Sequence, residues 1–159
     1  MSTRIFLDEA PLRLLAEATA AEPVTLPLDL SSLLDSGLQL FPPSERALES
    51  AIALIEDALM PCIPALRRYP LDLLRCEGAF MPQLGDAAGC ASGTGTVQLS
   101  IDALERVFNR IADVAAGIPA RSVQIPQSPG LVVTVLLLRE IMHHVGYPQL
   151  EVAPAAQPD

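Results

Sequence analysis

The sequence predicts an α/β domain in which helices pack on a small mixed sheet. Three observations support this: two strongly amphipathic helical segments, a third helix that is apolar on all sides, and short apolar or alternating segments between them. The elements alternate in the order helix, strand, helix, strand, loop, strand, helix, helix, strand, which is typical of α/β proteins. At 159 residues, the chain is long enough for one domain with its own core.

The first amphipathic helix is predicted over residues 45–60. Its apolar side chains recur at the spacing of one helix face: Leu48, Ala51, Ile52, Ile55 and Leu59. Ser44 can cap its N-terminus, because a serine oxygen accepts a hydrogen bond from a free backbone N–H of the first turn. Pro61 should end or bend it.

Two further helices are predicted in the second half of the chain. Ser100 is a suitable N-cap for the helix over 101–117, and Ser128 begins the helix that ends at Gly146. The first half of this last helix is apolar all round, so we expect it at the centre of the fold. His143 and His144 lie near its end, point about 100° apart on a helix, and are predicted to be surface residues and not metal ligands.

Short strands are predicted between these helices. They cover residues 24–30, 71–76, 96–100 and 148–154, and Pro27 makes the first of them an edge strand or a bulge. Residues 1–21 are expected to form an N-terminal helical segment, and residues 153–159 a disordered tail.

Charge and composition exclude several classes of function. The net charge is −9, the isoelectric point is about 4.6 and all ten cationic side chains are arginine, which disfavours nucleic-acid binding and anionic membranes. The apolar run over 131–138 is far shorter than a membrane span, and no secretory signal is visible, so a cytoplasmic location is expected. Cys62, Cys76 and Cys90 form no CxxC pair, so neither a metal site, a cofactor nor a disulfide framework is predicted.

One loop, over residues 76–100, is rich in Gly, Ala, Ser and Thr. Within it, Gly93, Thr94, Gly95 and Thr96 could present backbone amides to an anion. The alternative is a flexible connection, because the loop has no lysine and no strand directly before these residues.

From about residue 22 onward, three segments carry a family resemblance: "VTLPLDLSSLLDSGLQLFPPSERALESAIALIEDAL", "LDLLRCEGAF" followed by "TVQLSIDALERVFNRI", and "ARSVQIPQSPGLVVTVLLLREIMHHVGYPQLEV". In order and spacing they resemble the C-terminal half of the ASKHA core of the exopolyphosphatase and guanosine pentaphosphate phosphohydrolase (Ppx/GppA) family. The resemblance implies that residues 22–152 form a single lobe of the actin-like ATPase (ribonuclease H-like) type.

The same resemblance locates two phosphate loops, and both differ here from the family pattern. The first would fall at "RIFLDEAPLRLLAEA", which contains no glycine, and the second at "CEGA", where Glu77 precedes Gly78. Arg121 is retained, but Val123 stands where the family tends to have Asp, and the first lobe of the family is absent. A carboxylate beside such a loop would repel a phosphate.

Two functions remain open from the sequence. The first is a non-catalytic domain that binds a protein partner or forms a homo-oligomer. The alternative is a phosphate-, polyphosphate- or nucleotide-binding phosphohydrolase of exopolyphosphatase type, completed by a second chain, that binds a phosphate-containing small molecule. Its anion-binding residues would be Gly78, Gly93, Thr94, Gly95, Thr96 and Arg121.

Overall fold

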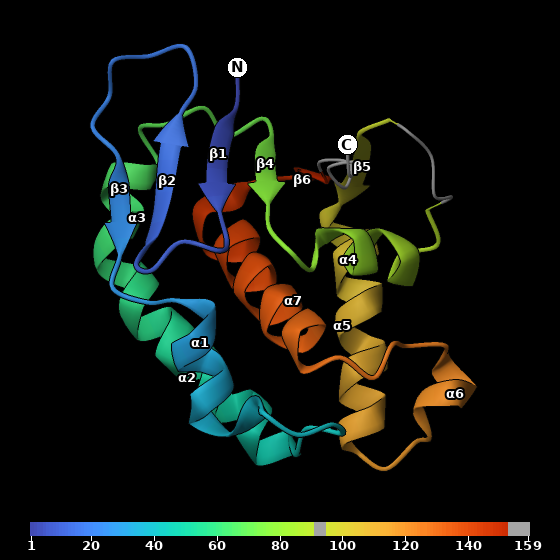
Figure 1. The fold of residues 1–159 in the computed structure, drawn as a ribbon. Coiled ribbons are helices and arrows are strands. Elements are labelled where there is room, and N and C mark those ends of the chain that lie inside the picture. The colour runs from blue at the N-terminus through green and yellow to red at the C-terminus, as the bar shows by residue number, and fades with distance from the viewer. Residues whose placement is uncertain (91–94, 153–159) are drawn as a thin grey trace, which may run out of the picture.

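The structure, a computed structural model, describes residues 1–90 and 95–152. Its centre is one six-stranded mixed sheet with the order β3-β2-β1-β4-β6-β5 (Figure 1). The strands are β1 (Thr3–Phe6), β2 (Leu12–Ala16), β3 (Val24–Leu26), β4 (Leu74–Glu77), β5 (Val97–Ser100) and β6 (Gln149–Val152). Parallel pairing joins β1 to β4 and β4 to β6, and the other neighbours are antiparallel. The α/β class expected from the sequence is confirmed.

The helices form a layer around α7, which lies between α2 and α5 and contacts both (Figure 1). Their bounds are α1 (Leu30–Leu33), η1 (Leu34–Leu38), α2 (Glu45–Leu59), η2 (Met60–Cys62), α3 (Ile63–Leu66), α4 (Met81–Ala87), α5 (Ile101–Ala115), α6 (Ala120–Val123), α7 (Pro129–Ile141) and η3 (Met142–Gly146). The expectation of a central apolar helix is confirmed, because most side chains of α7 are fully buried. In the described ranges, no helix combines the length and the apolar character that crossing a membrane requires.

Three serines begin the long helices, as the sequence predicts. The side-chain oxygens of Ser44, Ser100 and Ser128 accept hydrogen bonds from the backbone N–H groups of Ala47, Ala103 and Leu131, at 3.0, 3.1 and 3.2 Å. Each bond satisfies a donor that the first helical turn otherwise leaves free. The positions of α2, α5 and α7 therefore follow from local sequence.

The helices cover only one face of the sheet. On that face the strands bury alternate residues, including Ile5, Leu14, Cys76 and Val152, which the strand register places side by side. The residues between them, such as Arg4 and Arg75, are partly exposed on the opposite face. Among the described residues, the fold is thus a two-layer α/β structure with one open sheet face.

The expectation of a helical segment over residues 1–21 is wrong. These residues form β1 and β2, which pair as an antiparallel hairpin, so the sheet begins at Thr3 and not near residue 22. The physical reason is the period of burial: Leu12, Leu14 and Ala16 are buried while Arg13 is exposed, which is the alternation of a strand. The glycine-rich loop also contains a helix that the sequence analysis did not predict, α4. The predicted disordered tail at 153–159 lies outside the described residues.

Ion pairs occupy the open face of the sheet. Nη2 of Arg4 lies 2.6 Å from Oε1 of Glu17, and Nε of Arg75 lies 3.1 Å from Oε1 of Glu151. The Ser2 hydroxyl also donates a hydrogen bond to Glu17. This pairing lets charged side chains remain on the central strands, where no helix covers them.

Glu17 should make the stability of the protein depend on pH. The Ser2 hydroxyl, together with Arg4 and Arg75, holds the pKa of Glu17 below its usual range, although partial burial opposes this. Because the pKa is lower in the folded state than in the unfolded chain, the stabilisation is present above about pH 4.3 and is lost as the pH falls through the folded-state pKa. Glu17→Gln is expected to lower the free energy of unfolding by about 1 kcal/mol at pH 7, and by less as the pH falls below about 4.

Urea unfolding at a series of pH values measures this difference. Glu49→Gln is a suitable control, because Glu49 is exposed on α2. A Glu17→Gln difference that stays constant between neutral and acidic pH would contradict the prediction.

Candidate functional site

Two loops leave the sheet side by side, one after β1 and one after β4. Since β1 and β4 are adjacent parallel strands, the segments 7–11 and 78–80 emerge at the same edge. The backbone N–H of Leu7 donates to the carbonyl of Glu77 at 2.8 Å. These are the positions where the family resemblance locates two phosphate loops, so this edge is the candidate site.

The first loop closes on the second through a carboxylate. Oδ1 of Asp8 accepts a hydrogen bond from the backbone N–H of Ala79 at 3.3 Å. In a phosphate loop, such a backbone N–H points at the anion. Here an acidic side chain of the same protein accepts its hydrogen bond.

The approach of the two loops requires glycine at position 78. A Cβ atom added to Gly78 would lie 2.8 Å from Cβ of Leu7, which is closer than real Cβ atoms come to one another. Leu7 belongs to the neighbouring loop, and its Cβ can move only with the backbone. Close packing between the two loops therefore explains why this position is glycine. Anion binding is not required to account for it.

Acidic side chains surround a small cavity beside these loops. It measures about 210 Å³, and its lining includes Asp8, Glu9 and Asp29 but no basic residue among those the structure describes. Arg13 bonds to Glu9 at 2.7 and 2.9 Å, and its hydrogen bonds hold the pKa of Glu9 below the usual range, so Glu9 stays ionised at neutral pH. Because Arg13 offsets the charge of Glu9, the negative charge that disfavours a phosphate at this cavity comes from Asp8 and Asp29.

An aromatic ring fills the space between the β4 loop and the central helix. Phe80 precedes α4 and packs against Gly130 in the first turn of α7, so tightly that any Cβ at position 130 would overlap the ring. The ring also lines the acidic cavity.

The chain resembles known proteins in its structure. No protein-family profile and no curated protein matches the chain. Among solved structures, the Aquifex aeolicus PPX-GPPA enzyme superposes with a TM-score of 0.69 at 14% identity, over 96% of this chain and 52% of that one. An exopolyphosphatase from Cytophaga hutchinsonii gives 0.68 at 12% identity, covering 96% and 53% of the two chains. This protein has the fold of half a Ppx/GppA protein.

The Ppx/GppA-like fold agrees with the expected family resemblance and extends it. The chain spans about half the length of the structures it matches, as expected of a single lobe. The match covers nearly the whole chain, so the β1–β2 hairpin belongs to the lobe as well. At identities this low, the likeness shows the fold alone.

The residues expected to bind an anion are only partly brought together in this Ppx/GppA-like lobe. Gly78 lies at the β1–β4 edge, and Thr96 precedes β5 at the same edge, two strands away. Gly95 and Thr96 are exposed, whereas Gly93 and Thr94 lie outside the described residues. Arg121 is exposed on α6, next to the C-terminal end of α4, whereas Gly78 precedes the start of that helix. Sequence reasoning missed Asp8, because nothing local shows that it faces Ala79.

A larger cavity, of about 520 Å³, lies where α4, α5 and α6 of the lobe meet. Arg106 and Arg110 both line this cavity, and two arginines are typical of an anion-binding site. However, the guanidinium of Arg110 donates to the backbone carbonyls of Ala87 and Val123. Arg110, on α5, therefore links α5 to α4 and α6, and these hydrogen bonds use part of its guanidinium.

Proposed function

We propose that this chain is a non-catalytic domain with a Ppx/GppA-like fold that acts through protein–protein association, with a second copy of itself as the partner. The observation that carries the first part is the hydrogen bond from Ala79 to Asp8. This bond engages the backbone N–H of Ala79 in the β4 loop. The Asp8 carboxylate also places a negative charge where a phosphate would need positive potential. Asp29 adds to this repulsion.

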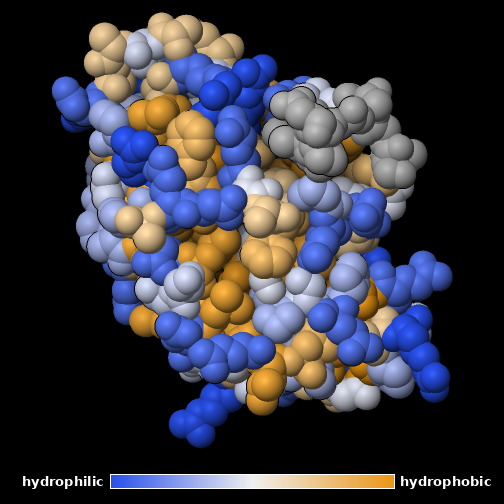
Figure 2. Space-filling view, in the orientation of Figure 1, coloured by the Kyte–Doolittle hydropathy of each residue, from blue (hydrophilic) through white to orange (hydrophobic). Residues whose placement is uncertain are grey.

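Association is supported by an uncharged apolar surface near the end of α5. A cavity of about 250 Å³ there is lined by apolar residues and one glutamine, among them Phe41, Pro42 and Ile118. Ile118 is 42% exposed, and Leu40, next to Phe41, is 80% exposed. Figure 2 shows apolar side chains in the middle of the face of the molecule that it presents. Exposed apolar surface of this kind is typical of association sites.

A second copy is the proposed partner because of the uncharged cavity lining and the size of the chain. The chain carries a net charge of −9, so self-association must overcome long-range repulsion, and a contact surface without charged side chains adds least to it. The described lining of the cavity beside Ile118 contains no charged residue. The matched Ppx/GppA structures are about twice as long, so a dimer of this chain would restore a comparable mass.

The free thiols agree with a cytoplasmic location, which we include in the proposal. All three cysteines are unpaired, and burial strongly raises the pKa of the Cys76 thiol. Reduced cysteines of this kind are typical of proteins in a reducing compartment.

Size-exclusion chromatography with light scattering, over a concentration series, tests the proposal. The wild-type chain is expected to run as a dimer that dissociates on dilution. The double variant Leu40→Ser/Ile118→Ser should raise the dissociation constant at least about tenfold, since it removes exposed apolar contact area. Leu54→Ser is the matched control, because Leu54 is 44% exposed on α2, a helix that contributes no residue to this cavity.

Two results would contradict the proposal. A monomer at every concentration, or equal effects of the double variant and of Leu54→Ser, would argue against self-association through this surface. Release of phosphate from polyphosphate by the purified wild-type chain would argue against a non-catalytic role and favour the phosphohydrolase alternative.

A further inference from the structure

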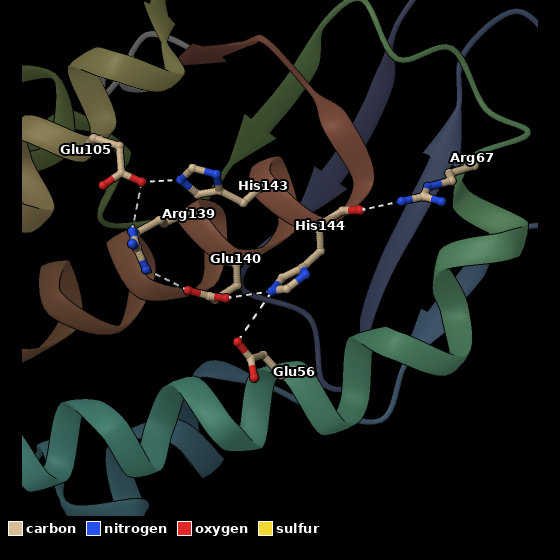
Figure 3. A network of polar contacts seen from close by, with 7 residues as sticks. All are labelled: Glu56, Arg67, Glu105, Arg139, Glu140, His143 and His144. Atoms are coloured by element: carbon tan, nitrogen blue, oxygen red, sulfur yellow. Dashed lines mark hydrogen bonds and ion pairs between the residues drawn. The ribbon is translucent and has the colours of Figure 1, made fainter.

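Helix α2 and the end of α7 meet at a cluster of polar side chains (Figure 3). Nε2 of His144 lies 3.0 Å from Oε2 of Glu140 and 3.4 Å from Oε1 of Glu56. One ligand atom from each of these residues can be chosen so that all lie within 4.8 Å of one another. Two carboxylates and an imidazole nitrogen therefore converge on one point.

These distances fit the coordination of a small divalent metal ion. Zinc–nitrogen and zinc–oxygen bonds measure about 2.0–2.1 Å, so neighbouring ligands of a tetrahedral ion lie about 3.4 Å apart. The two printed separations at Nε2 are close to that value. An imidazole with two carboxylates suits zinc and related first-row transition metals, whereas calcium needs six or more oxygen ligands.

Arg139 holds the carboxylate of Glu140 from the side opposite His144. Its side chain is only 5% exposed, and Nη1 of Arg139 donates to its Oε1 at 2.8 Å, leaving Oε2 toward His144. Nε of Arg139 in turn bonds to Glu105 at 3.0 Å, and Glu105 also contacts His143. Such an outer layer of hydrogen bonds holds carboxylate ligands in place at metal sites.

The charge of the cluster also favours a cation. With both imidazoles neutral, the carboxylates of Glu56, Glu105 and Glu140 face the single guanidinium of Arg139, which leaves two negative charges. Arg67 bonds to the backbone carbonyl of His144 at 3.1 Å and lies on the other side of that residue from the carboxylates (Figure 3). One divalent cation would balance the remaining charge in this partly buried place.

We propose that Glu56, Glu140 and His144 form a binding site for one divalent transition-metal ion of the zinc type. The site joins α2 to the π-helical turn η3 at the end of α7, so a bound ion would tie the two elements together. Three protein ligands leave the fourth position of a tetrahedral ion to water. His144 must then bind through a neutral imidazole, with its Nε2 unprotonated.

Isothermal titration of the full chain with Zn²⁺, after treatment with a chelator, tests the site. We expect one ion per chain, and a rise in the melting temperature on the order of 5 °C at a hundredfold excess over the dissociation constant. Glu56→Gln and His144→Gln should each weaken binding at least about tenfold. Both side chains are partly exposed, at 43% and 32%, so the variants should still fold, which circular dichroism verifies.

The neighbouring histidine provides a matched control. His143 lies one residue away and contacts Glu105 but belongs to no ligand set with Glu56. His143→Gln should therefore keep zinc binding within about twofold of the wild type. The proposal is overturned if the wild type binds no zinc, if binding survives in His144→Gln, or if His143→Gln abolishes it equally.

Discussion

Replacing Arg139 by methionine is expected to lower the free energy of unfolding by about 3 kcal/mol. Arg139 pairs with Glu140, whose side chain is 5% exposed, and its guanidinium also lies 4.0 Å from the ring centre of Phe108. Methionine keeps much of the packing volume but leaves the buried carboxylate of Glu140 without its main partner. Removing one member of a buried ion pair costs more than the pair contributes, because the other charge stays desolvated.

Thermal or urea unfolding in the presence of a chelator measures this loss. Arg106→Met is the control, since Arg106 is exposed on α5 and no ion pair to it is found in the described part of the chain; its effect should stay within about 0.5 kcal/mol. The double variant Arg139→Met/Glu140→Gln should recover part of the loss, because it removes the unpaired charge. Equal losses for Arg139→Met and Arg106→Met would show that Glu140 does not depend on Arg139.

Replacing Gly78 by alanine is expected to destabilise the protein by about 1–3 kcal/mol. The added methyl group would meet Cβ of Leu7 at 2.8 Å, and neither atom can move away without a shift of the backbone. Such a shift would also disturb the hydrogen bond between Asp8 and Ala79. The measurement is urea unfolding of the variant beside the wild type.

Replacing a second glycine, Gly85, by alanine is expected to change stability in the opposite direction. Gly85 lies within α4, and a Cβ at this position would meet nothing within 4 Å. Gly85→Ala should therefore stabilise the protein by about 0.5–1 kcal/mol, since alanine restricts the unfolded chain and favours the helix. If both alanine variants changed the free energy of unfolding in the same direction, the close contact of the two loops would not be the reason for glycine at position 78.

The two proposals concern different parts of the lobe and can fail separately. Association depends on the apolar surface around Leu40 and Ile118, whereas metal binding depends on the cluster at the end of α7. The acidic edge with Asp8 and Gly78 takes part in neither of these two; it supports the non-catalytic half of the proposed function. Light scattering with and without zinc would show whether the two are linked.

The long helices could be predicted from the sequence alone. The caps Ser44, Ser100 and Ser128 and the apolar periodicity of α2, α5 and α7 act within a few residues of one another, so the information is local. The order of the elements after residue 22 was also sufficient to recognise the Ppx/GppA-like fold, which the structural comparison confirms.

Tertiary structure alone determines the β1–β2 hairpin, the contact between Asp8 and Ala79, and the meeting of Glu56 with His144. The interpretation of residues 1–21 as helical failed because strand identity there depends on tertiary pairing: β2 pairs with β1 and β3, and β1 pairs with β4, some seventy residues away. Asp8 and Ala79 are 71 residues apart, and Glu56 reaches His144 from another helix. Only Glu140 and His144, four residues apart on one helix, could have been paired from the sequence. Local propensity determined where helices form, whereas the meeting of distant side chains required the sheet register and the packing of α2 against α7.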